Sequence, residues 1–102
     1  MSVTIRDLYE THLAAGYPPG LSGDAEIAGI SLIILDADIA GLAQSFLTAE
    51  GRLRPDQWFT LRECLAHTRA VLPHLKGDAW VHFARLHALA QALLRSAPAP
   101  EG

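Results

Sequence analysis

The stretch Ile27-Ala-Gly-Ile-Ser-Leu-Ile-Ile-Leu-Asp-Ala-Asp-Ile-Ala-Gly-Leu-Ala-Gln-Ser-Phe-Leu47 is apolar along almost its whole length, and it decides the fold. A segment that is apolar on nearly every side has to be surrounded by the rest of the protein. Its length favours a helix, although the β-branched residues near its start leave open whether residues 27–35 begin as strand or helix. With Ser31 as a suitable N-cap and Gly51 as the stop, we predict a buried helix here.

Two acids, Asp36 and Asp38, interrupt this apolar stretch. A buried acid is costly unless it is paired or hydrogen-bonded. On a regular helix the two side chains project in nearly opposite directions, which excludes a paired-carboxylate acid/base couple. We expect Asp36 to be the more buried one and to bond Arg62 or Arg69 of the next helix, with Asp38 in solvent. Alternatively, Asp36 lies in a pocket and binds a ligand or a cationic group of a partner.

The remaining apolar spacing predicts three more helices, over about residues 3–15, about residues 55–72, and from an N-cap near Asp78 onward. Mostly short connections between the helices favour antiparallel packing. We therefore predict an all-α fold, a single-domain antiparallel bundle of about four helices over residues 1–96. The helix within residues 27–47 is expected to be its most buried member.

Length and charge narrow the class of protein further. The chain has 102 residues with 8 basic and 11 acidic side chains, which fits one domain followed by a flexible tail at residues 97–102. There is no basic stripe, so we expect no nucleic acid among its partners. We also expect no membrane span, because the two central acids would each cost about 2.5–3.5 kcal/mol on insertion. A lone cysteine, Cys64, suits a reducing cytoplasm, and the Arg- and Ala-rich composition suggests a bacterial source.

Four of the five histidines lie in the C-terminal half of the chain. If the third and fourth helices form a hairpin, His87 comes near His67, and Glu63 lies one helical turn before His67. Glu63, His67 and His87 are therefore a candidate transition-metal site. No His-Glu-x-x-His motif or cysteine pair supports it, and the alternative is a set of surface histidines. We expect no bound cofactor.

The segment Tyr17-Pro18-Pro19-Gly20 breaks both helix and strand. We interpret it mainly as a rigid crossover between the first two helices, and alternatively as a recognition turn in which Tyr17 contacts a partner. Cys64 and His67 could form a nucleophile pair, but a thiol in mid-helix among leucines is typical of a core residue. No catalytic motif is present, so the sequence does not predict an enzyme.

The aromatic residues of the last two helices suggest a contact surface. Phe59 follows Trp58 and so points about 100° away from it on a helix. On the fourth helix we expect Trp80 in the core, with Val81 and His82 turned outward, so that Phe59, Val81 and nearby Ala residues form one apolar patch. The sequence therefore predicts a non-catalytic helical protein that acts through protein contacts, as a homodimer or as a small partner or neutraliser of another protein. The alternative is a small-molecule- or metal-binding bundle.

Overall fold

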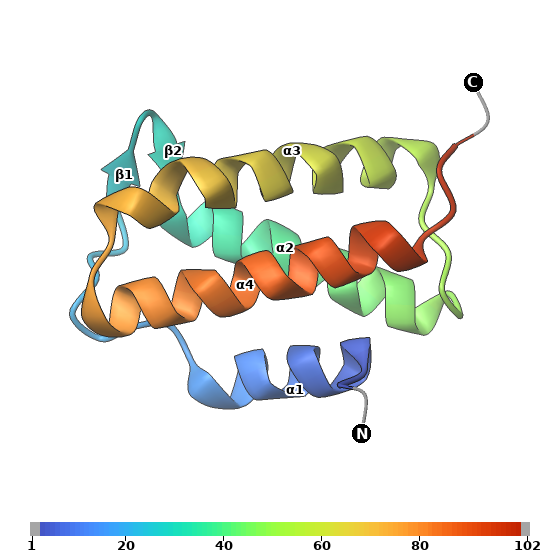
Figure 1. Cartoon of the computed structure of the whole chain (residues 1–102), viewed down its shortest axis with the longest axis horizontal. Coiled ribbons are helices and arrows are strands. Elements are labelled where there is room, and N and C mark those ends of the chain that lie inside the picture. The colour runs from blue at the N-terminus through green and yellow to red at the C-terminus, as the bar shows by residue number, and fades with distance from the viewer. Residues whose placement is uncertain (1–2, 101–102) are drawn as a thin grey trace.

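A computed structural model describes residues 3–100 of the chain, and four α-helices make up most of it (Figure 1). The elements, in chain order, are α1 (Ile5–Ala15), β1 (Glu26–Ile27), β2 (Ile30–Ser31), α2 (Leu32–Thr48), α3 (Pro55–Val71), the 3-10 turn η1 (Leu72–His74) and α4 (Gly77–Ser96). The two short strands form an antiparallel hairpin. The predicted all-α class with about four helices is confirmed.

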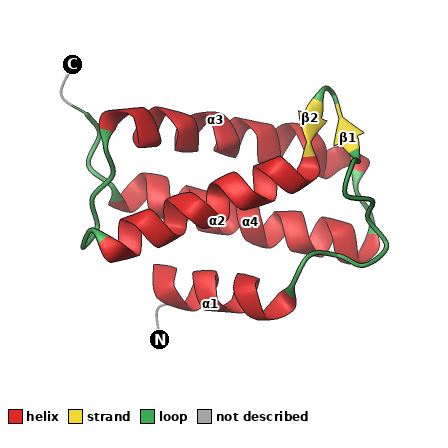
Figure 2. Cartoon of the chain, turned by 180° about the vertical axis from the view of Figure 1, so that it is seen from behind, coloured by secondary structure: helices red, strands yellow, loops and turns green. Residues whose placement is uncertain are grey.

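The four helices run alternately up and down, with α2 and α4 in the middle and α3 and α1 on either side of them (Figures 1 and 2). Helix α4 packs against each of the other three helices. It buries a row of fully inaccessible side chains: Phe83, Leu86, Leu89, Ala90 and Leu93. The burial predicted for the second helix is shared by α4, because each of the two helices buries six residues and leaves two large apolar side chains exposed.

The apolar stretch begins with two short strands and continues as helix α2. Glu26–Ile27 pairs with Ile30–Ser31 across a two-residue turn, in which Ala28 and Gly29 both have positive φ. Such turns fit the twist of a hairpin. Ser31 then caps α2, because its hydroxyl accepts a hydrogen bond from the backbone N–H of Ile34. The predicted cap is confirmed, and the β-branched residues before it contribute the strands.

Several predicted helix boundaries also agree with the structure. Helix α3 begins at Pro55, and α1 ends before Gly16, whose φ is +70°. Helix α4 differs, since it begins at Gly77 and has Lys76 as its N-cap, so that Asp78 lies in the first turn. There its charge still interacts favourably with the helix dipole.

The C-terminal segment after α4 contributes to the core. Ala97 is buried, so packing continues one residue past the predicted end of the domain at residue 96. Of the predicted tail, residues 101 and 102 lie outside the described residues. Among residues 3–100, no helix combines the length and the apolar character that crossing a membrane requires.

The predicted apolar patch is not continuous. Phe59 is exposed as expected, but Trp80 is also exposed, at 46%, while His82 is 2% exposed. Phe59 shares a surface pocket with Leu94, which is thirteen residues after Val81 on α4. At a rise of 1.5 Å per residue, these thirteen residues span about 20 Å of α4. Val81 is therefore about 20 Å along the helix axis from Leu94, beside which Phe59 lies. Helix α4 is rotated about its axis relative to the prediction, because it packs against three other helices. This rotation buries His82.

Candidate functional site

The carboxylate of Asp36 lies between two histidine rings in the interior of the bundle. Its Oδ1 is 2.8 Å from His12 Nε2, and its Oδ2 is 2.6 Å from His82 Nε2. The side chains of His12 and His82 are 6% and 2% exposed, and that of Asp36 is 14% exposed. The three residues, called the His–Asp–His cluster below, form the most buried polar group of this size in the described chain.

Three different helices supply these side chains at one end of the bundle. His12 lies in the last turn of α1, while Asp36 and His82 lie in the second turns of α2 and α4. Because α1 runs opposite to α2 and α4, the end of α1 meets the starts of the other two beside the β-hairpin (Figure 1). The ring centroids of the two histidines are 4.8 Å apart. The up-down topology therefore assembles the cluster.

The environment keeps Asp36 ionised. Burial acts to raise the pKa of its carboxyl group, but the hydrogen bonds from His12 and His82, together with the charge interactions with both rings, outweigh burial and lower that pKa below its ordinary value. In each bond the ring Nε2–H donates and a carboxylate oxygen accepts. The cluster therefore holds a negative charge against two nitrogen donors.

A fourth polar group, the hydroxyl of Tyr17, lies beside the cluster. The ring of Tyr17 packs edge-on against His82, with the centroids 5.8 Å apart. Burial, and then the charge of Asp36, raise the pKa of Tyr17. Among residues 3–100, its buried hydroxyl has no hydrogen-bond partner, and neither do the Nδ1 atoms of His12 and His82. Three further buried polar atoms of the described chain, in Trp58, Arg85 and His87, also have no protein partner, so such atoms are not confined to the cluster.

The cluster has the donor atoms of a transition-metal site. Its ligand atoms lie within 4.8 Å of one another. Two imidazoles and one carboxylate suit zinc, iron(II), cobalt or nickel, at bond lengths of about 2.0–2.2 Å. A bound ion would replace the two hydrogen bonds of 2.8 and 2.6 Å, so the three ligand atoms would have to move apart.

The predicted partners of Asp36 were wrong. Neither Arg62 nor Arg69 bonds it, and both are exposed on α3. The guanidinium of Arg62 instead stacks over the ring of Trp58 at 5.8 Å. Asp36 bonds side chains of α1 and α4, and the prediction that it is more buried than the exposed Asp38 is confirmed.

The other predicted metal ligands are not brought together. Within residues 3–100, His12, Asp36 and His82 are the one group of three close enough to hold an ion, so Glu63, His67 and His87 do not form such a group. Glu63 is exposed, whereas His87 is partly buried. Burial, together with the charge of Arg69, lowers the pKa of the His87 ring.

Cys64 is a core residue. It is buried on α3, and burial, with Asp38 and Glu63 nearby, raises the pKa of its thiol to about 11. A thiol with so high a pKa is a poor nucleophile at neutral pH. This burial supports the core interpretation over the pair with His67.

The sequence contained one signal for the cluster that our prediction did not use. His12 falls within the apolar stripe of the first helix, with Leu8 and Tyr9, just as Asp36 falls within the apolar stretch of the second. Two polar residues on buried faces need partners, and each could have been the partner of the other. No comparable pattern marked His82, because helical periodicity predicted that its side chain lies on the outer face of the fourth helix.

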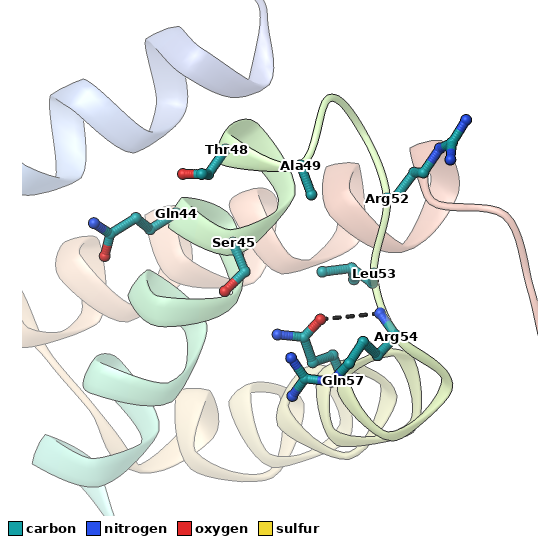
Figure 3. A pocket seen from close by; sticks show the side chains of 8 residues that line it. All are labelled: Gln44, Ser45, Thr48, Ala49, Arg52, Leu53, Arg54 and Gln57. Atoms are coloured by element: carbon teal, nitrogen blue, oxygen red, sulfur yellow. Dashed lines mark hydrogen bonds between the residues drawn. The ribbon is translucent and has the colours of Figure 1, made fainter.

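A different pocket lies at the opposite end of the bundle (Figure 3). It has a volume of about 480 Å³ and is lined by the end of α2, the 49–54 loop and the start of α3. Two of its polar residues, Arg54 and Gln57, already have local partners. The backbone N–H of Arg54 donates to Gln57, and the guanidinium of Arg54 pairs with Asp56. No residue predicted as a site lines it.

Comparisons with protein-family models, curated proteins and solved structures found no match for this chain.

Proposed function

We propose that the protein is a metal-binding helical bundle, which holds one divalent transition-metal ion with His12, Asp36 and His82. The observation that carries this proposal is the convergence of both Nε2 atoms on one carboxylate inside an otherwise apolar interior. When the imidazoles bind as neutral ligands, their Nε2 lone pairs point at the same small volume as a carboxylate oxygen. The sequence predicted metal binding by the bundle as the alternative function, with Glu63, His67 and His87 as the ligands.

The donor set of the cluster, two imidazoles and one carboxylate, is what supports a metal. Both Nδ1 atoms, which lie on the far side of each ring from Nε2, are without protein partners in the described chain, so with an ion at Nε2 each would take a water as its second partner. Asp36 also provides the single negative charge that partly neutralises a divalent ion.

Metal titration of the apo-protein tests this proposal. After chelation and dialysis, calorimetry with zinc is expected to show one ion bound per chain, with protons released as the imidazole Nε2 positions become ligands. His82→Gln and His12→Gln should abolish binding. His74→Gln, on the exposed turn η1, is the matched control and should bind as the wild type does.

Two further results would decide the question. His67→Gln separates this site from the one predicted at Glu63, His67 and His87, and it is expected to leave binding unchanged. Circular dichroism of each variant checks that the helices remain folded. Absence of zinc, cobalt and nickel binding by the folded wild type, or full binding by folded His82→Gln, would overturn the proposal.

A second candidate is contact with protein, as a homodimer or with a cytoplasmic partner. What favours it is the exposure of several large apolar side chains, among them Phe59 on α3 and Trp80 with Val81 on α4. Exposed apolar surface is typical of interaction sites. Sedimentation of wild type, Phe59→Asp and Trp80→Asp tests it: a dimer weakened by one variant locates the interface. A monomer at high concentration would reject the homodimer.

A further inference from the structure

Helix α3 presents a second surface, which shares no residue with the His–Asp–His cluster. Four of its side chains recur at intervals of three, four and three positions, so they lie along one face of the helix. They are Phe59, Arg62, Ala66 and Arg69, and all four are exposed. Phenylalanine is usually a core residue, yet Phe59 is 55% exposed. This face therefore combines an exposed aromatic ring with two cationic side chains.

All four residues line one pocket between α3 and the end of α4. Its volume is about 510 Å³, which is within the usual range for small-molecule sites. Leu65 of α3 and Leu94 of α4 supply further apolar wall, and Leu65 is buried, so it lies on the side of the pocket that faces the core. An apolar group that enters the pocket would lose its contact with water against Phe59, Leu65 and Leu94, which favours binding.

The charged side chains of the pocket leave one positive charge in excess, because Arg62 and Arg69 stand against a single acid, Glu63. In the part of the chain that the structure describes, neither arginine forms an ion pair. The charge of Arg69 reaches α4, since it contributes to the lowered pKa of the His87 ring. The pocket therefore offers two guanidinium groups that no carboxylate of residues 3–100 neutralises.

We propose that this pocket binds a small amphipathic carboxylate, an organic acid with one carboxylate group and an apolar or aromatic body. Guanidinium groups suit a carboxylate because they can form two parallel hydrogen bonds with it. Arg62 and Arg69 begin about 10 Å apart along α3, and their long side chains can converge on a carboxylate between them. The body of the ligand packs against Phe59 and Leu94, and this apolar wall disfavours an inorganic anion such as phosphate. The proposal goes beyond the metal function and does not depend on it.

Phenylpropanoate is the probe, and it is titrated into the metal-free protein while NMR follows the backbone amide signals. We expect saturable shifts in α3 from Phe59 to Arg69 and around Leu94. Phenylethylammonium has a similar apolar body and the opposite charge, so it should cause no saturable shift there. Added salt should weaken the binding of phenylpropanoate, because salt screens exposed charges.

Substitutions in the pocket test the role of each group. The double variant Arg62→Gln/Arg69→Gln should weaken phenylpropanoate binding about tenfold, since each exposed charge pair accounts for roughly a factor of three. Phe59→Ala should weaken it about fivefold through the loss of the aromatic contact. Glu63→Gln should strengthen it, because the change removes the one repulsive charge of the pocket.

Arg6→Gln and Leu13→Ala are the matched controls, since both residues are exposed on α1, on the other side of the bundle from α3 (Figure 1). Leu13 is 56% exposed, close to the value for Phe59. Both controls should bind phenylpropanoate as the wild type does, and circular dichroism checks that each variant is folded. Shifts confined to other parts of the molecule, equal binding of phenylethylammonium, or unchanged affinity in the folded double variant would each overturn the proposal. None of these results would affect the metal function.

Discussion

The two ends of the bundle use polar side chains in opposite ways. At the end with the β-hairpin, buried hydrogen bonds join residues 24 and 46 positions apart in the sequence, Asp36 with His12 and with His82. At the end with the 49–54 loop, the bonds of Arg54 join residues two or three positions apart on the surface. Long-range buried bonds constrain how helices pack, whereas local exposed bonds shape only their own turn.

The largest effect is expected from Asp36→Ala. This change leaves two buried histidine donors without their shared acceptor, and we expect the free energy of unfolding to fall by about 3 kcal/mol. Urea denaturation of the metal-free protein measures it. Asp38→Ala is the control, because Asp38 is exposed on the same helix, and it should change stability by roughly 0.5 kcal/mol or less. Similar losses in both variants would show that the cluster contributes no specific stabilisation.

A smaller effect is expected when the metal-free protein is acidified. Hydrogen bonds from His12 and His82 lower the pKa of Asp36, so its stabilising contribution is complete above the unfolded-state value of about 3.9. It is lost as the pH falls through the lower pKa of the folded state. The stability difference between wild type and Asp36→Asn should therefore shrink below about pH 4. A difference that stays constant from neutral to strongly acidic pH would contradict this assignment.

The smallest effect is expected at the other end of the molecule. Asp56→Ala removes the ion pair with Arg54, whose side chains are both largely exposed. The pair lowers the pKa of Asp56 mainly through its hydrogen bond. Because solvent screens such a pair, we expect no measurable shift of the urea midpoint. A destabilisation as large as that of Asp36→Ala would remove the contrast between the two ends.

Local sequence signals were sufficient for most of the helices. The Ser31 cap, the start of α3 at Pro55 and the end of α1 at Gly16 all follow from the preferences of single residues. The exposure of Phe59 followed from its angle to Trp58. These features depend on residues within a few positions of each other, and periodicity along one chain segment captures them.

The rotation of α4 could not be predicted in this way. Trp80 is exposed and His82 is buried, which is the reverse of the prediction, because α4 packs against three helices and its buried face is wide. Helical periodicity gives the spacing of a face but not which of two overlapping faces is covered when neighbours lie on several sides. The candidate site depends on this rotation, since it turns His82 inward.

The sequence by itself determined the all-α class, the approximate helices, and the need of Asp36 for a partner inside an apolar segment. Only the tertiary structure decided which residues are that partner, because His12 and His82 reach Asp36 from helices far away along the chain. The physical reason is that helix propensity and burial of apolar surface are satisfied by many side-by-side arrangements. The packing actually adopted determines which polar side chains meet.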